Sequence, residues 1–434
     1  MRWQLVELSA AAAGASTVTL QVEAKAPVSR LFSNSVAMAA ANVAGRGLGY
    51  AYIVLMARRM DARYLGAYAL LLTASMLIEL VSNLGLDKIM VREISAGSAS
   101  VGQGYFWAAL PIRFVMASVS AVVAWSLLIA LFKGQLLASP LSCALFLSTI
   151  VPVVATRNCE AFLTAHERMM PIAASQLCEK VVIFGAVLLL VSGSLSFGGL
   201  LCFAPLAASV RLMVVAAFVI RMWVRHITPA RANIRMLLRQ GAELFSVEIL
   251  ALVYFRSDVF FVAKMGGLGA AGIYQIAYKI FDFCLSLFAG FLQAVFPRMV
   301  RDKSSRSLKV TLAVGTGLLM IPVVVIILGR YLILGAFRPE YVGGSTSLVW
   351  LMLTVPLVFI TSNMANMAIA AGRIKILILL AGLLIVSNVG LNLLLIPRWS
   401  FNGAAFSTFA CELVSAVVLC PFILKVISVP GGQQ

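Results

Sequence analysis

The sequence consists of apolar runs long enough to cross a bilayer, separated by short gaps rich in basic and turn-forming residues. A helix needs roughly 20 apolar residues to cross the hydrocarbon layer, whereas the helices of a soluble core are usually shorter. Twelve runs meet this length, and we predict that each forms a membrane-spanning helix. Their approximate bounds are 34–57, 65–86, 106–132, 139–164, 171–192, 198–223, 240–263, 270–296, 307–328, 345–371, 374–396 and 401–424.

The overall composition supports a membrane protein. Hydrophobic residues make up 62% of the chain and charged residues only 12%, which leaves too little polar surface to coat a soluble globule. The formal net charge is +18, but the Lys and Arg residues gather in the gaps, as membrane topology requires, and we expect no nucleic-acid partner. The seven cysteines lie singly in apolar runs without a CxxC pair, so we predict neither a disulfide nor a bound metal.

The gaps predict the orientation of the chain. If the N-terminus lies inside, the cytoplasmic gaps carry most of the Lys and Arg residues, so both termini are expected in the cytoplasm. The link at Arg58-Arg59 falls outside against this rule. The longest links, 87–105 and 224–239, leave no room for a folded extramembrane domain. We predict cytoplasmic tails at 1–33 and 429–434 and a basic cytoplasmic linker at 226–239.

An internal repeat becomes visible when the sequence is aligned with itself at an offset of about 206 residues. This offset equals six predicted helices, so the two halves have the same topology and are expected to be related by an axis along the membrane normal. We therefore predict two pseudo-symmetric six-helix bundles, 34–225 and 240–428. The aligned landmarks are Gly66-Ala67-Tyr68 with Gly272-Ile273-Tyr274, Arg92 with Arg298, Asn158 with Asn363, Arg168 with Arg373, and Gly198-Gly199 with Gly403-Ala404.

Several short motifs lie near the ends of the predicted helices. They are Ala57-Arg58-Arg59, Gly66-Ala67-Tyr68, Asn83-Leu84-Gly85-Leu86, Val91-Arg92-Glu93, Leu391-Asn392-Leu393-Leu394-Leu395-Ile396-Pro397 and Asn402-Gly403-Ala404-Ala405. Together they resemble the polysaccharide transporter branch of the multidrug/oligosaccharidyl-lipid/polysaccharide flippase superfamily, which includes the O-antigen and exopolysaccharide flippases of bacterial inner membranes. The resemblance implies an all-α polytopic protein that works by alternating access. It also implies a cargo of undecaprenyl-pyrophosphate-linked oligosaccharide, contact with membrane lipid, and a polysaccharide polymerase and assembly proteins as partners.

Basic residues inside the predicted spans are the candidates for cargo binding, because a charge within the bilayer usually faces a cavity or a partner. Arg46, Arg211 and Arg256 lie well inside their spans, with no opposite charge three or four residues away. A guanidinium stays charged when dehydrated and can hold two phosphate oxygens at once. We predict that these three arginines contact the pyrophosphate, although pairing with acids across helices is open. Further candidates for the pyrophosphate or glycan are Arg157, Asn158 and Lys279.

Acidic residues inside the spans have two interpretations. Arg157 with Glu160, and Lys279 with Asp282, are spaced three residues apart, so each pair can neutralise itself on one helical face. Three other acids are candidates for a proton or sodium site and equally for cross-helix partners of arginine. These are Glu79, Glu248 and Asp258.

Two other functions are compatible with part of the sequence. A drug exporter of the same superfamily carries organic cations, for which acids such as Glu79 and Glu248 are suitable but deep arginines are not. A membrane polysaccharide polymerase or ligase typically has a sizeable outer loop, whereas the largest outer gap here, 330–344, is short. No GxxxxGK[ST] loop is present, so we expect no catalytic residues and no cofactor. One chain supplies both halves of a cavity, and a monomer is expected.

Overall fold

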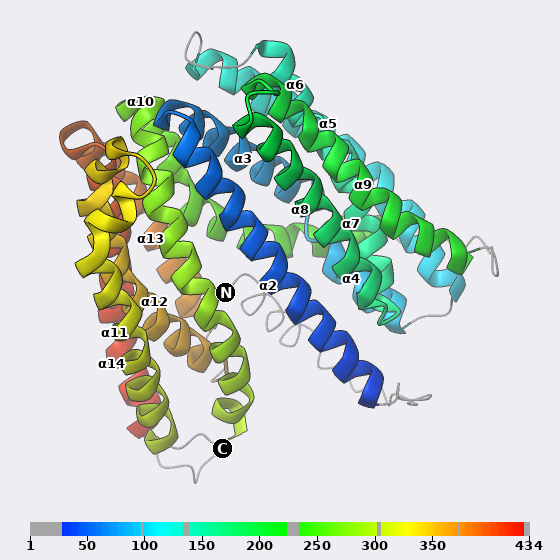
Figure 1. Ribbon diagram of the computed structural model, residues 1–434. Helices are drawn as coiled ribbons and strands as arrows, with labels where there is room; N and C mark the ends of the chain where they lie inside the picture. Colours follow the sequence, from blue (N-terminus) through cyan, green and yellow to red (C-terminus); the bar gives the residue numbers. More distant parts are fainter. Residues whose placement is uncertain are drawn as a thin grey trace. The chain divides into compact units, whose positions relative to one another are not determined.

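The computed structural model describes residues 28–96, 99–132, 139–223, 234–301, 305–370 and 374–428. Within these ranges the chain forms helices joined by short turns, and no strand is present (Figure 1). The elements are α2 (Val28–Arg59), α3 (Ala62–Asn83), α4 (Leu86–Ala96), α5 (Ala99–Phe132), α6 (Pro140–Leu147), α7 (Ile150–Ala165), α8 (Met169–Val191), α9 (Phe197–Trp223), α10 (Ile234–Arg301), α11 (Ser305–Gly335), the 3-10 helix η1 (Pro339–Gly344), α12 (Ser345–Ala370), α13 (Ile374–Trp399) and α14 (Phe401–Ser428).

The predicted all-α membrane fold is confirmed. Each predicted span overlaps a helix, except that 139–164 is divided between α6 and α7, and that α10 contains both 240–263 and 270–296. The change of direction within α10 lies at Gly267, whose φ of 85° is outside the helical range. Nine helices of the described residues are long and apolar enough to cross a membrane, and Leu319–Gly335 is a shorter apolar helix.

The link predicted at 87–105 is wrong in one respect, because it contains the helix α4. This helix buries Leu86, Ile89, Met90 and Ile94 on one face and carries its charges on the other, a pattern too short and too polar to resemble a span. Gly85 allows the chain to turn from α3 into α4. Its φ is 68°, and an added Cβ would lie 2.7 Å from the Leu244 Cβ.

Other boundaries also differ from the prediction. The first span begins at Val28, so part of the predicted tail is helical, while residues 1–27 and 429–434 lie outside the described part. The predicted linker 226–239 is helical from Ile234 onward, because α10 begins there. The rest of the linker falls outside the described residues.

The chain folds into two compact units. The N-terminal unit contains α2 and Leu71–Ile249, and the C-terminal unit contains Met60–Leu70 and the chain from Leu250 onward. The start of α3 thus belongs to the C-terminal unit, and the start of α10 belongs to the N-terminal unit. The predicted bundle boundaries at 34–225 and 240–428 stay a prediction.

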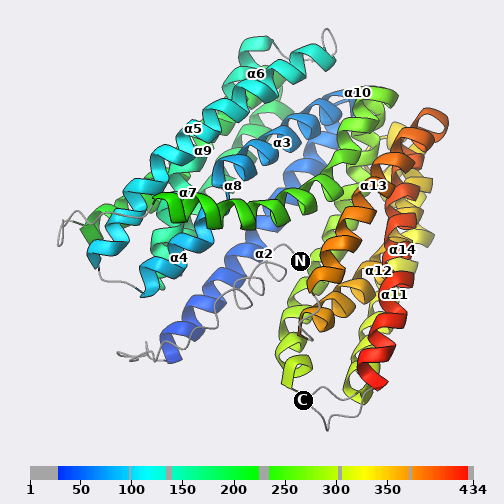
Figure 2. The ribbon, with the colours of Figure 1, turned by 180° about the vertical axis from the view of Figure 1, so that it is seen from behind.

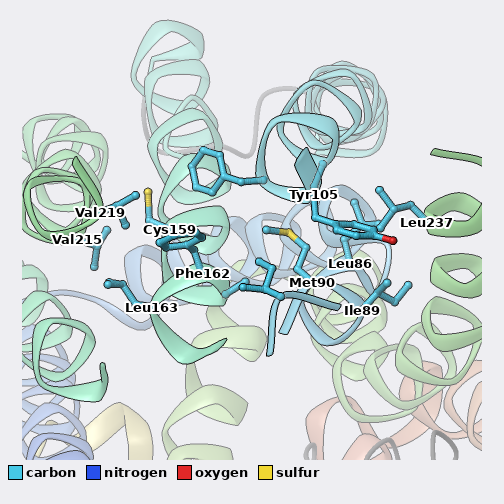
Figure 3. Packing of buried hydrophobic residues seen from close by; sticks show 14 of the residues in the cluster. Leu86, Ile89, Met90, Tyr105, Cys159, Phe162, Leu163, Val215, Val219 and Leu237 are labelled. Atoms are coloured by element: carbon cyan, nitrogen blue, oxygen red, sulfur yellow. The ribbon is translucent and has the colours of Figure 1, made fainter. Parts of the chain in front are cut away.

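The N-terminal unit contains an apolar cluster on α4, α5, α7, α8, α9 and the first turns of α10 (Figure 3). Met90 of α4 and Phe162 of α7 lie within this cluster, and Leu237 brings α10 into it. Within a membrane, such contacts stabilise the unit by van der Waals packing between the helices. The amphipathic face of α4 is therefore what fixes the start of α10.

The C-terminal unit is built around α14, which packs on α12 and α13 (Figure 2). Its apolar cluster includes Leu384 of α13 and Cys411 of α14. Neutral polar residues also point into this packing, and Asn388, Asn392 and Thr408 are all buried. The unit therefore has a polar layer inside an apolar bundle.

Within the C-terminal unit, the first turns of α3 cross α10 at two glycines. A Cβ on Gly66 would lie 1.9 Å from the Leu268 carbonyl oxygen, and a Cβ on Gly272 would lie 1.8 Å from the Ala62 carbonyl oxygen. The two contacts are equivalent under the 206-residue offset, since it relates Ala62 to Leu268 and Gly66 to Gly272. Such a reciprocal contact is what a two-fold axis generates, so the crossing supports the internal duplication.

Candidate functional site

Four helices of the N-terminal unit, α3, α7, α8 and α9, bring six charged side chains together inside the apolar bundle. We call this group the charged network. It contains three acids and three bases, so its formal charge is zero. The members are Glu79, Arg157, Glu160, Glu179, Lys180 and Arg211.

Arg211 of α9 binds two acids at the buried end of the network. Its Nη2 lies 2.7 Å from Glu160 Oε1, and its Nη1 lies 2.7 Å from Glu179 Oε2. The cross-helix pairing that the sequence left open is therefore present for Arg211. A guanidinium enclosed by two carboxylates fixes the relative positions of α7, α8 and α9.

Arg157 of α7 binds Glu79 of α3, with its Nε 2.7 Å from Glu79 Oε1. The two residues predicted to pair within α7, Arg157 and Glu160, form their ion pairs with Glu79 and Arg211 of neighbouring helices. The three-residue spacing allows a pair within the helix, but Glu79 and Arg211 on neighbouring helices lie within hydrogen-bond distance of Arg157 and Glu160. Glu79, a predicted ion-coupling acid, is thus the partner of a base.

The bases and acids of the network differ in exposure. The side chains of Arg157, Lys180 and Glu79 are 36%, 34% and 30% exposed, whereas those of Arg211, Glu179 and Glu160 are 17%, 15% and 9% exposed. Lys180 is loosely bound, with its Nζ 3.8 Å from Glu179 Oε1. The accessible edge of the network is therefore richer in positive charge than its buried end.

The helix α2 carries Arg46 and passes Lys180 of α8 at Gly45. It packs on α8, and a Cβ on Gly45 would lie 3.9 Å from the Lys180 Cγ. The next residue is Arg46, which is exposed and lies on the same turn of α2. Asn158 is placed differently, since its buried amide donates to the Phe106 carbonyl oxygen at 3.0 Å; its predicted glycan contact stays a prediction.

The remaining predicted cargo residues, Arg256 and Lys279, lie in the C-terminal unit. Both bind Asp282, at 3.5 Å from Arg256 Nη2 and 3.6 Å from Lys279 Nζ. The predicted pair of Lys279 with Asp282 is confirmed. Arg256 also stacks over Tyr278, with its Cζ 5.3 Å from the ring centroid, so two bases share one acid and an aromatic face.

The acid Asp258 lies deep in the C-terminal unit among neutral partners. Its carboxylate accepts from the Asn392 amide at 2.7 Å, the Thr408 hydroxyl at 3.0 Å and the Tyr274 hydroxyl at 3.1 Å. No base of the described residues lies within ion-pair distance of it. Glu248, by contrast, binds Lys88 at 3.1 Å. Of the three predicted ion-coupling acids, Asp258 alone has only neutral partners in the described part of the chain.

Sequence reasoning missed the neutral residues that surround Asp258. The Asn392 amide also lies 2.9 Å from Asn388 Oδ1, one helical turn earlier, and the Ser257 hydroxyl lies 3.4 Å from the same oxygen. The available signal was two asparagines spaced four residues apart within an apolar run. The described residues hold no group of three or more His, Cys, Asp or Glu side chains suited to a metal ion. The oxygen-rich surroundings of Asp258 instead suit a proton or a monovalent cation.

Comparisons with known proteins agree with this architecture. The sequence model of a family described as "Polysaccharide biosynthesis protein" matches residues 31–303. The fold is similar to the structure "Lipid II flippase MurJ, inward closed conformation", with a TM-score of 0.73, 14% identity and coverage of 90% of each chain.

Two further structures are of a multidrug resistance MATE family transporter of the MOP superfamily. Its inward-facing conformation has a TM-score of 0.72, with 13% identity over 88% of this chain and 94% of that chain. Its outward-facing conformation has a TM-score of 0.63, with 14% identity over 91% and 95%. No curated protein sequence matches significantly. At these identities, the structural similarity concerns the fold.

Proposed function

This chain belongs to the polysaccharide biosynthesis protein family, and from this premise we propose that it is a flippase for undecaprenyl-pyrophosphate-linked oligosaccharide repeat units. Precursors of O-antigen or exopolysaccharide would be moved across the bacterial inner membrane by alternating access. The observation that carries the proposal is the basic edge of the charged network, where Arg157 and Lys180 remain accessible within apolar helices. An anionic head group is the ligand that such an edge attracts.

The physical difficulty of this transport lies in the head group. A pyrophosphate with several sugars must cross about 30 Å of hydrocarbon, and its charge has to be compensated throughout. Arg157 can exchange the Glu79 carboxylate for a phosphate oxygen without losing its counter-charge. Arg46, on the adjacent α2, supplies a second guanidinium, while Arg211 holds the network in place from its buried end.

In the C-terminal unit we propose a parallel role for Arg256 and Lys279. Each is held by Asp282, and a phosphate or an acidic sugar can replace that acid as a partner. Because two bases share one carboxylate, this group retains a positive charge even when the acid is ionised. The hydrocarbon tail of the cargo stays in the lipid.

We further propose that transport is coupled to a proton or sodium gradient through Asp258. A buried carboxylate without a base needs a proton or a cation for compensation, and the hydroxyl and amide oxygens around Asp258 can contribute to holding either. Glu79 and Glu248, which bind bases, serve the network and the packing of α4 instead. In this proposal both termini lie in the cytoplasm, and the protein acts as a monomer beside a polysaccharide polymerase and assembly proteins.

Transbilayer movement in proteoliposomes tests the function. A fluorescent undecaprenyl-pyrophosphate oligosaccharide is followed with the wild type and with the variants Arg157→Ala, Arg211→Ala and Arg256→Ala, each checked for folding. We expect movement by the wild type and a loss of about tenfold or more in the variants, since a charge-assisted hydrogen bond contributes about 1.5–3 kcal/mol. Arg92→Ala is the matched control, because Arg92 is exposed and binds Glu93 outside the network.

Two outcomes contradict the proposal. If a folded wild type moves none of several lipid-linked glycans but exchanges organic cations, the protein is a drug exporter. If the cargo moves equally in all variants, the function stands and the site is wrong.

A further inference from the structure

One buried carboxyl group of the C-terminal unit has no part in the cargo and cation sites described above. Glu412 lies on α14, and the residue is only 4% exposed. No base of the described residues lies within ion-pair distance of its carboxyl group. We propose that Glu412 is a proton-binding site of this protein, separate from Asp258, that gains and loses a proton during the transport cycle. The role of Glu412 in transport rests on the proposed function, whereas the binding of a proton by Glu412 does not.

Three helices meet at the carboxyl group of Glu412. Its Oε1 accepts from the Tyr254 hydroxyl of α10 at 3.0 Å, and its Oε2 accepts from the Thr361 hydroxyl of α12 at 3.0 Å. Both oxygens are thus engaged, but by neutral groups. An ionised carboxylate so deeply buried lacks a counter-charge, and the simplest compensation is a proton.

The Thr361 hydroxyl allows the site to hold Glu412 in either protonation state. It lies 3.0 Å from Glu412 Oε2 and also 3.3 Å from the Val358 carbonyl oxygen. When the carboxyl is ionised, the single hydroxyl hydrogen points to Oε2. When the carboxyl is protonated, its own O–H donates to Thr361, and the hydroxyl hydrogen turns to Val358. Each state is fully hydrogen-bonded, so the proton can come and go without leaving an unsatisfied group.

The positions of the two buried acids are related. Asp258 of α10 accepts from Thr408 of α14, while Glu412 of α14 accepts from Tyr254 of α10. Each acid lies one helical turn from the partner of the other, so α10 and α14 are joined by two successive acid–hydroxyl contacts. Loss or gain of charge at either acid therefore acts on the same pair of helices.

The titratable groups near Glu412 are few. Among the described residues, those of α10 are Tyr254, Tyr278, Asp258 and Arg256, whose guanidinium is paired with Asp282, and the one of α14 itself is Cys411. The helix α12 contains no titratable side chain, and α13 contains only Lys375 and Arg398, at its two ends. Nothing in this set compensates a negative charge at mid-helix.

A proton suits this position better than a metal cation. Among the described residues, the hydrogen-bond partners of Glu412 are two hydroxyl groups, whereas Asp258 has hydroxyls, an amide and the nearby Asn388 oxygen. Two hydroxyls and one carboxyl group offer a cation too few oxygens for a closed shell, while a proton needs only the carboxyl itself. The proton that binds Glu412 comes from water and returns to water, and no other reactant is needed.

Infrared difference spectroscopy of the reconstituted full-length protein tests the proposal directly. A protonated carboxylic acid has a C=O stretching band that the carboxylate lacks. On acidification we expect the wild type to show a component of this band that the isosteric variant Glu412→Gln lacks, while the components of Asp258 and of the other carboxyl groups remain. Retention of the whole band in Glu412→Gln, or its loss only in Asp258→Asn, would overturn the proposal.

A pair of threonine variants keeps the test valid even if Glu412→Gln fails to fold. Thr361→Val removes a hydrogen-bonding partner of the carboxyl group and is expected to shift the frequency of the band. Thr354→Val is the matched control, because Thr354 is a buried threonine of the same helix whose hydroxyl donates to the Trp350 carbonyl oxygen at 2.8 Å. An equal effect of both variants on the band would contradict the assignment.

The role in transport is tested by imposing a proton gradient on proteoliposomes. The rate of cargo movement by the wild type is expected to respond to the gradient, and that of Glu412→Gln is expected not to. An unchanged response in this variant contradicts a role of Glu412 in coupling. If the wild type moves no cargo at all, the proposed function fails, and the infrared experiment still decides whether Glu412 binds a proton.

Discussion

In the N-terminal unit, the buried Glu160 and the partly buried Glu179 bind the guanidinium of Arg211, whereas in the C-terminal unit Asp258 and Glu412 are buried against hydroxyl and amide groups. The first arrangement compensates each charge with an opposite charge that the chain always carries. The second arrangement contains no opposite charge, so a bound proton or cation has to compensate the carboxylate. We therefore expect the two acids bound to Arg211 to hold their helices together, and Asp258 and Glu412 to be available for exchange of a proton or a cation.

The largest effect on stability is expected from Arg211→Met. The substitution leaves Glu160 and Glu179 buried without their base, and removing one partner of a buried ion pair costs about 3–5 kcal/mol. Thermal unfolding in detergent would measure it. Adding Glu160→Gln and Glu179→Gln to the variant should restore most of the stability, and a failure to do so would show that packing around Arg211 matters more than charge.

A smaller loss is expected from Glu160→Gln alone. It removes a charged partner of Arg211 while Glu179 remains, so the cost should be near that of one charge-assisted hydrogen bond, about 1.5–3 kcal/mol. The same unfolding measurement applies, with Glu93→Gln as a control at a partly exposed acid that is paired with Arg92 outside the network. A cost equal to that of Arg211→Met would mean that Glu179 contributes nothing.

Asp258→Asn should cost less still, about 1 kcal/mol or below, because the neutral amide keeps most of the size and some of the hydrogen bonds of the carboxylate. Transport, however, should lose its response to an ion gradient. Unfolding and gradient-driven flipping measured on the same sample separate the two effects. A stability loss as large as that of Arg211→Met would remove the contrast between the units.

The smallest effect is expected from Lys180→Ala. Its Nζ lies 3.8 Å from Glu179 and the side chain is partly exposed, so the ion pair contributes about 0–1 kcal/mol. Unfolding should change little, while binding of an anionic head group weakens. A large loss of stability would show that Lys180 belongs to the buried end of the network.

The helices were predictable because long apolar runs specify them with little help from tertiary contacts. The helix α4 was not predictable, since its short apolar face is stabilised only by the helices that cover it, α5, α7 and α10. The ion-pair partners of the arginines could not be predicted from the sequence either. Glu79 and Arg157, for example, lie on different helices, and many such pairs are possible. A search restricted to ionisable residues passed over Asn388 and Thr408, whose hydrogen bonds define the surroundings of Asp258.

The central claim is that the basic edge of the charged network accepts pyrophosphate in exchange for Glu79. Binding of undecaprenyl pyrophosphate to the purified protein tests it most directly, with Glu79→Gln and Arg157→Ala compared against the wild type. We predict tighter binding by Glu79→Gln, because the variant removes the acid that competes with phosphate for Arg157. We also predict binding about tenfold weaker by Arg157→Ala. Equal affinity in all three proteins, or weaker binding by a folded Glu79→Gln, would contradict the claim.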